Sequence, residues 1–365
     1  MTATIAVAAS LTATTAPAAT AEVVLDRTTL SEVYDPPPGF YTYAPSVVRD
    51  GDTEWIWTCH NDEADAIKDH IYMTKVVDGV VVESRSVLQA SPAPAWDSFH
   101  VCDPSVISGS FRLDGERYGY AMFYLGNDLD ASAHNQIGVA FAKAPEGPWV
   151  KYPDPLVTFD RQDQWGVGQP SAVALAPGSG RVMLFYTRGD TSTRAYQRVL
   201  DLGDMRTPEV GPPTLLTTDG LVGTDGGPDW LNGYDVALDR DRGRVYTVRE
   251  QHPYPELNPW WIGEAVQLAS MPMANVLSGG GEWSVEADVD QQVTGHPRNH
   301  NAGLVRTWHG YLPARERIEI VFTDSCESLP TVEDPDWSQA TCDSLFEYDL
   351  WSITGTVVDR PGHGQ

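Results

Sequence analysis

The sequence predicts an all-β fold, a five-bladed β-propeller of four-stranded antiparallel blades, and three observations support this prediction. A short apolar strand starts from a similar cue five times, with equivalent points at Ala44, Asp103, Gln169, Asn232 and Asn301. The spacings between these points are 59, 66, 63 and 69 residues. They are somewhat longer than the roughly 40–50 residues of common propeller repeats. In this chain, apolar residues seldom keep the spacing of an amphipathic helix beyond about two turns. Because propeller blades stack their first strands around an axis, the five strand starts are expected to meet in one funnel.

Strands alternate with turn signals inside each repeat, as antiparallel blades require. In the second repeat the expected strands are 105–108, 118–124, 136–142 and 149–156. In the third repeat they are 171–176, 181–187, 196–201 and 214–217. The five blades are expected near residues 40–90, 99–160, 165–218, 228–290 and 296–358.

The first 21 residues carry no charge and end in Ala19-Thr20-Ala21, which is typical of a secretory signal with a small-residue cleavage site. The positively charged start of such a signal is missing. Residues 22–365 are expected to form a single domain. No later stretch approaches the roughly 18 apolar residues that are needed to span a bilayer. We therefore expect a secreted, extracellular protein.

The formal charge is −27, from 51 acidic and 24 basic residues. Nucleic-acid binding relies on Lys and Arg that neutralise phosphates, and anionic membranes repel an acidic surface. The charge therefore argues against nucleic acid and membrane as partners, and it suits a soluble extracellular protein. We expect a monomer.

Four cysteines fit an oxidising compartment. Cys326 and Cys342 bracket a polar excursion in the fifth repeat, so a disulfide between them is the first expectation. Cys59 and Cys102 would then form a second disulfide that ties the first repeat to the second. A zinc site is the alternative, but no paired Cys or Cys/His spacing supports it.

Several segments carry a family resemblance. They are Asp103-Pro104-Ser105-Val106, residues 120–124, 135–142 and 146–149, repeated in part by Gln169-Pro170-Ser171 and residues 182–186. This succession resembles the blades of the five-bladed propeller glycoside hydrolases, especially family 43 and its relatives, which include xylosidases, arabinofuranosidases and arabinanases. The resemblance covers the second and third repeats well and the others by period only.

The resemblance implies a carboxylate mechanism with an Asp as base or nucleophile, a second Asp as a pKa tuner and a Glu as general acid. Asp103 matches the first position, and the following proline would hold its backbone extended. A turn-capping Asp is the alternative. Asp235, two blades further on, matches the tuner, or is a buried structural Asp.

The general acid is where the chain departs from the family pattern, because the fifth repeat offers Arg298-Asn299-His300-Asn301 and no acid. Glu250 is the nearest candidate, and a solvated ion pair is its alternative role. His300 is the other candidate donor, since its ordinary pKa is near 6.5. Two carboxyl groups about 5–5.5 Å apart would retain the anomeric configuration, and roughly 6.5–9.5 Å would invert it. The resemblance implies inversion.

Sugar sites pair aromatic platforms with short polar groups. The sequence places such residues around the expected funnel, and the substrate-binding candidates are His100, Trp165, Gln169, Trp230, Asn232, His300 and Asn301. No cofactor is expected. A structural calcium is conceivable at residues 225–229 or at His296 with His300, although neither has EF-hand spacing.

The first functional hypothesis is therefore a secreted glycoside hydrolase acting on a pentose-containing or related glycan. The second is a non-catalytic carbohydrate-binding propeller that has lost its acid, favoured by Asn301 standing where a Glu is expected. The third is a lyase or transglycosylase that uses the same funnel.

Overall fold

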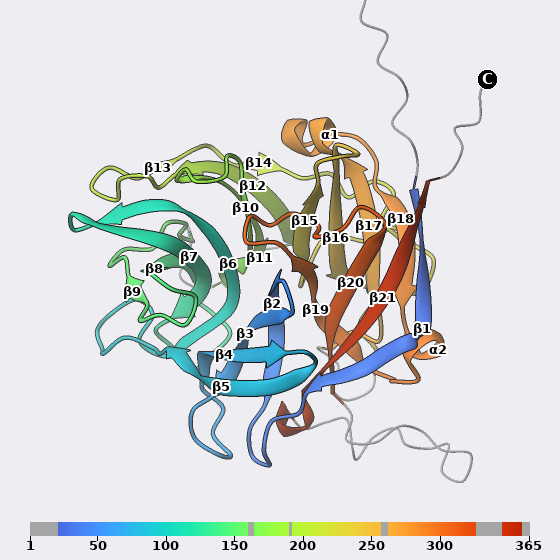
Figure 1. Ribbon diagram of the computed structural model, residues 1–365, viewed down its shortest axis with the longest axis horizontal. Coiled ribbons are helices and arrows are strands. Elements are labelled where there is room, and N and C mark those ends of the chain that lie inside the picture. The colour runs from blue at the N-terminus through green and yellow to red at the C-terminus, as the bar shows by residue number, and fades with distance from the viewer. Residues whose placement is uncertain (1–20, 160–163, 190–191, 257–261, 326–344, 360–365) are drawn as a thin grey trace, which may run out of the picture.

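The computed structural model describes residues 21–359, except for 160–163, 190–191, 257–261 and 326–344. Most of these residues lie in antiparallel strands arranged around a common centre (Figure 1). No helix among them is long and apolar enough to cross a membrane. The expected signal segment, except Ala21, and the Cys326–Cys342 pair lie outside the described residues.

The described strands form four sheets, and we divide the eight-stranded sheet at its one parallel contact into a first and a fifth antiparallel group. With the other three sheets, this division gives five groups in chain order. The first group contains β2 (Thr42–Asp50), β3 (Thr53–Asn61), β4 (Asp69–Val77) and β5 (Val80–Leu88). The second contains β6 (His100–Leu113), β7 (Glu116–Asn127), β8 (Gln136–Ala142) and β9 (Val150–Lys151). The third contains β10 (Gly166–Ala174), β11 (Arg181–Gly189), β12 (Thr193–Asp201), β13 (Glu209–Val210) and β14 (Thr214–Leu215). The strands expected in the second and third repeats are found, although the last ones are shorter. The third group also contains β13, so the expectation of four strands is wrong there.

The fourth group contains β15 (Asp235–Asp239), β16 (Arg244–Glu250), β17 (Val266–Pro272) and β18 (Ser284–Val289). Two short helices, α1 (Met273–Ser278) and α2 (Gln291–Thr294), lie before and after β18. A single 3-10 turn spans Leu345–Glu347. The fifth group contains β19 (Asn299–Arg306), β20 (Arg317–Asp324) and β21 (Asp349–Asp359).

The first and last described strands meet in the fifth group. Strand β1 (Ala21–Tyr34) pairs antiparallel with β21 over nearly its full length, and Figure 1 shows the blue and red strands side by side. The repeat spacing did not predict this strand, because it lies before the first repeat. The fifth group also joins the first through two parallel pairs between β19 and β2, Val305 with Val47 and Arg306 with Val48.

Apolar side chains pack together at each contact between neighbouring groups. One buried cluster spans the first and second groups, and others span the second and third, the third and fourth, and the fourth and fifth. A smaller cluster, which includes Val47, Ile56, Val305 and Leu350, joins the fifth group back to the first. Apolar burial, at about 25 cal/mol per Å², therefore holds the groups in a ring.

The expected strand starts share an unusual backbone conformation. Five residues, which we call the rim residues, have left-handed φ angles between +40° and +52°: Ala44, Asp103, Gln169, Gly233 and Asn301. In four groups the rim residue begins a bulge, because it and the residue after it face a single residue of the second strand. The fourth equivalent point is therefore Gly233 and not Asn232. The sequence-based choice was wrong by one residue, because Asn resembles the polar rim side chains while the conformation selects Gly.

Two residues after the rim, polar side chains link each first strand to the next. Each accepts a hydrogen bond from a backbone N–H of the following group, over 2.9–3.2 Å. We call these four residues the axial ring: Ser46, Ser105, Ser171 and Asp235. The recurring Pro-Ser-Val pattern thus has a physical reason, since the serine satisfies a backbone donor on the neighbouring first strand.

Arg306 of β19 fills the centre of the axial ring. Its side chain is fully buried and lies 3.1 Å from the Asp235 carboxylate. It also donates to the hydroxyls of all three ring serines, at 3.2–3.4 Å, and to the Val236 carbonyl at 3.0 Å. One guanidinium therefore bonds to the first strands of four groups at once.

We predict that Arg306→Met lowers the free energy of unfolding by about 3–5 kcal/mol, because the Asp235 carboxylate stays buried without its cation. Urea titration measures this loss. The control is Arg317→Met, since that arginine is largely exposed in its ion pair with Glu319 and should cost under about 1 kcal/mol. Equal losses in the two variants would show that the axial ring does not depend on Arg306.

Candidate active site

A cavity of about 820 Å³ opens beside the rim residues. Three rim residues, Asp103, Gln169 and Asn301, line this cavity and also a small axial pocket of about 40 Å³ that all five rim residues line. The described lining of the large cavity includes the carboxyl groups of Asp69, Asp103 and Glu250 and contains no Lys or Arg. The expected convergence of far-separated acids on one funnel is therefore found for Asp103 and Glu250.

Asp103 owes its place to the rim conformation. Its φ is +47°, so the extended backbone expected before Pro104 is wrong, and the two residues together form the bulge. One carboxylate oxygen, Oδ2, accepts the backbone N–H of Gln169 at 3.2 Å. The other, Oδ1, faces the sulfurs of Cys102 at 3.5 Å and Cys59 at 3.9 Å. Burial, reinforced by the negative charge of Asp69, raises the pKa of Asp103 to about 7.

Those two sulfurs form the disulfide that the sequence predicted between the first and second repeats. The bond joins β3 to β6 at the cavity wall. Ala44 has no side chain that could accept the N–H of the next rim residue, and Cys59 Sγ takes that role, 2.9 Å from Asp103 N. The zinc alternative for these cysteines is excluded, because both sulfurs are used in the disulfide.

Glu250 reaches the rim from the end of the second strand β16. A Cβ on Gly233 would lie 2.8 Å from the Glu250 carboxyl carbon, so the carboxylate occupies the space that a rim side chain would fill. Glu250 Oε1 accepts the Asn301 backbone N–H at 3.2 Å, and Oε2 accepts the Tyr254 hydroxyl at 2.5 Å. Burial raises the pKa of Glu250, and these two hydrogen bonds oppose the rise.

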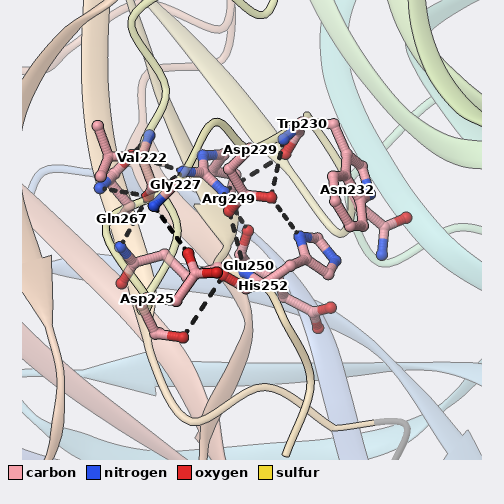
Figure 2. Close-up of polar contacts among 12 residues, drawn as sticks. Val222, Asp225, Gly227, Asp229, Trp230, Asn232, Arg249, Glu250, His252 and Gln267 are labelled. Atoms are coloured by element: carbon pink, nitrogen blue, oxygen red, sulfur yellow. Dashed lines mark hydrogen bonds and ion pairs between the residues drawn. The ribbon is translucent and has the colours of Figure 1, made fainter.

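Buried ion pairs fix the strand end that carries Glu250. Arg249 is fully buried and bonds to Asp229, Val222 and Gln267 (Figure 2). Asp229 also accepts from the backbone and ring of His252, at 2.9 Å each. These contacts hold the segments on both sides of Glu250. Glu250 itself is buried and bonds to Tyr254 and Asn301, and no ion pair joins it to another described residue, so the solvated ion pair weighed as its alternative role is not found there.

Asp69 is a third acid that sequence reasoning missed. It begins β4, and its Oδ1 accepts the Tyr41 hydroxyl at 2.8 Å, while Oδ2 lies 3.0 Å from His100 Nδ1. The Asp69 charge raises the pKa of Asp103, a role that the sequence gave to Asp235. The repeat pattern gives no signal for Asp69, because it follows a long loop and not a first strand.

Asp235 lies in the axial ring and borders the small axial pocket, not the large cavity. Its carboxylate accepts Ser171 Oγ at 2.7 Å and Leu304 N at 2.9 Å, beside Arg306. These contacts correspond to the structural alternative that the sequence left open. Its role as an orienter of Asp103 stays a prediction.

Of the seven expected substrate-binding residues, five line the cavity: His100, Trp165, Gln169, Asn232 and Asn301. The other two do not. Trp230 is 38% exposed and stacks on His252, with ring centroids 4.0 Å apart. His300 is buried with Nδ1 at 2.7 Å from Asn301 Oδ1, and burial lowers its pKa to about 4. His300 is therefore neutral near pH 7, which does not suit the proton-donor role considered for it.

The residues considered as calcium ligands form contacts with other residues of the protein. Asp225 accepts the Gly227 backbone N–H at 2.8 Å in a local turn, and Asp229 bonds to Arg249 and His252. His296 contacts Asp324 at 2.8 Å. Within the described part of the chain, His296 and His300 do not combine with other ligands into a cluster that could hold an ion.

No protein-family model and no curated protein matches this chain. Solved structures do match its fold. The chain shares the fold of the family-43 glycoside hydrolases and their relatives. A thermostable family-43 glycoside hydrolase has a TM-score of 0.54 and 15% identity, covering 89% of this chain and 91% of that one. A family 117 glycoside hydrolase from Zobellia galactanivorans has a TM-score of 0.56 and 11% identity, covering 93% of each chain.

A third match is an α-L-arabinofuranosidase from Podospora anserina in complex with cellotriose. Its TM-score is 0.56 and its identity 10%, covering 89% of this chain and 95% of that one. At these identities the likeness establishes the fold. Activity has to be argued from the site itself.

We predict that Gly233→Ala displaces the Glu250 carboxylate and lowers the free energy of unfolding by about 1–3 kcal/mol more than a matched glycine change. The match is Gly79→Ala, because Gly79 also has a positive φ, +74°, but an added Cβ meets nothing within 4 Å. Thermal unfolding and a crystal structure of the variant check this. An unmoved Glu250 with equal losses in both variants would contradict the proposed placement.

Proposed function

We propose that this protein is a glycoside hydrolase that uses Asp103 and Glu250 as its two carboxyl groups. The observation that carries the proposal is the presence of both groups in one cavity of about 820 Å³, within the size range of small-molecule sites. Glycoside hydrolysis requires a pair of carboxyl groups, one protonated and one ionised. Buried acids that face one cavity meet this need, because their charges push the pKa values apart.

The five strand groups are, in this proposal, the blades of a five-bladed propeller. The five apolar clusters and the β19–β2 pairing support this count, since they link each group to the next. Family-43 likeness favours inversion, in which one carboxylate activates water while the other carboxyl group protonates the leaving oxygen. The Cys59–Cys102 disulfide is consistent with secretion.

The cavity chemistry favours a neutral sugar. Trp165 supplies an aromatic surface, and Gln169, Asn232 and Asn301 supply amides that can bond to hydroxyl groups. Solved structures of the same fold include a family-43 enzyme from Xanthomonas citri with xylotriose. We therefore propose pentose-containing oligosaccharides as the substrate class.

The first test is release of reducing sugar from arabinan, xylan and fructan by the wild type. We expect Asp103→Asn and Glu250→Gln each to lower the rate on the active glycan by about 10²–10⁴-fold. Asp114→Asn is the control, because Asp114 is an exposed aspartate with a similar φ of +53°. Saccharide binding without turnover by the wild type would instead support the non-catalytic carbohydrate-binding protein, which Asn301 at the fifth rim position favours.

The second test concerns charge. Three acids and no described Lys or Arg face the cavity, so a uronic-acid branch should be repelled. We expect glucuronate-bearing xylotriose to compete with neutral xylotriose about tenfold more weakly at low salt. The difference should shrink as salt screens the repulsion. Equal inhibition by the two sugars at low salt would contradict the neutral-substrate assignment.

A further inference from the structure

The three acids of the cavity differ in the hydrogen-bond donors that they receive. Asp69 accepts the Tyr41 hydroxyl at 2.8 Å on one oxygen, and His100 Nδ1 lies 3.0 Å from the other. Glu250 accepts one donor on each oxygen, from Asn301 N and the Tyr254 hydroxyl. Donors of this kind stabilise the charged form of a carboxylate.

Asp103 receives far less support for a negative charge. The one donor to it in the described part of the chain is Gln169 N, at 3.2 Å on Oδ2. Its Oδ1 faces the two sulfurs of the Cys59–Cys102 disulfide, which carry no hydrogen to donate. A carboxyl group that is buried and poor in donors is the one that keeps its proton.

The nearby acidic groups raise the pKa of Asp103, and the histidine on the described cavity wall, His100, contacts Asp69. Asp69 of β4 and Glu250 of β16 both contribute negative charge, and Tyr43 of β2 faces Asp103 as a neutral phenol whose own pKa burial raises. No Lys or Arg lines the described cavity wall that could offset them. Where three carboxyl groups share such a site, the protonation state of lowest free energy keeps one of them protonated.

We propose that Asp103 is the proton-holding acid of this cavity, that Glu250 is its carboxylate base, and that the Cys59–Cys102 disulfide preserves the acid by keeping donors away from it. This exchanges the roles expected from the sequence. The protonated state of Asp103 is inferred from the contacts of Asp103 alone. The assignment of acid and base rests on the proposed glycosidase activity.

In the proposed reaction, one proton is donated and one is taken up. Asp103 gives its proton to the glycosidic oxygen as the bond from that oxygen to the anomeric carbon breaks. Glu250 takes a proton from the water whose oxygen bonds to the anomeric carbon. The products are two hydroxyl-bearing sugars. Transfer of one proton from Glu250 to Asp103 through solvent then restores the starting state.

The first measurement does not depend on activity. Infrared titration of the protein labelled with ¹³C-aspartate follows the carbonyl stretch of protonated carboxyl groups, and the difference from Asp103→Asn isolates one residue. We expect that band to disappear with a midpoint near pH 7. A midpoint in the ordinary range of an exposed aspartate, near pH 4, overturns the proposal.

The second measurement tests the disulfide with two variants that both lack it. In Cys59→Ala with Cys102→Ala no donor replaces the sulfurs, and the Asp103 midpoint should stay near that of the wild type. In Cys59→Ala with Cys102→Ser a hydroxyl can reach Asp103, and the midpoint should fall by about one pH unit or more. Thermal unfolding of both variants checks that they fold equally. Equal midpoints in the two folded variants overturn the role of the disulfide.

The third measurement assigns acid and base, and it uses leaving groups that do not need protonation. On dinitrophenyl xyloside, Asp103→Asn should lose less than about tenfold, while it loses about 10²–10⁴-fold on xylotriose. Glu250→Gln should lose heavily on both substrates. The opposite pattern would make Glu250 the acid and overturn the assignment. A wild type inactive on every glycoside would refute the hydrolase and leave the infrared result standing.

Discussion

The buried contact between Arg306 and the axial ring is the constraint on which the rest of the structure depends. A propeller-like ring has no central core of its own, because its first strands end in polar backbone groups around an axis. Here serine hydroxyls and the Asp235 carboxylate satisfy those backbone donors, and one guanidinium ties them together. Such a cation is tolerated in a buried place because Asp235 and several oxygens surround it. Arg306 of the fifth group thereby joins its own first strand to those of the other four groups.

The backbone conformation of the rim residues determines which side chains reach the cavity. Each rim residue adopts a left-handed conformation, and the Asp103 and Gln169 side chains each accept the backbone N–H of the next rim residue. Two rim residues, Ala44 and Gly233, lack such a side chain, and second-strand residues take their places. Cys59 fills one place and Glu250 the other. The second strand of the fourth group thus brings a second carboxyl group to the rim, in the space left by the absent side chain of Gly233.

Sequence spacing was sufficient to predict the elements that repeat. The five strand starts, the Asp103 position and the amides Gln169 and Asn301 all follow from one recurring pattern, and the Cys59–Cys102 pair followed from the placement of the other two cysteines. Elements that lie outside the repeat pattern were not predicted. Strand β1 completes the fifth group from outside the repeats, and Asp69 enters the cavity after an irregular loop. Asn232 was taken for the rim residue because its chemistry resembled that of its equivalents, whereas backbone conformation decides that position.

The most direct test of the assigned roles is a crystal structure of the Glu250→Gln variant with a bound xylo-oligosaccharide. We predict a sugar in the cavity beside Trp165, with a glycosidic oxygen within hydrogen-bond distance of the Asp103 carboxyl group and the amide at position 250 on the opposite side of the anomeric carbon. A sugar bound away from the rim, or one whose glycosidic oxygen faces position 250 and not Asp103, would contradict it.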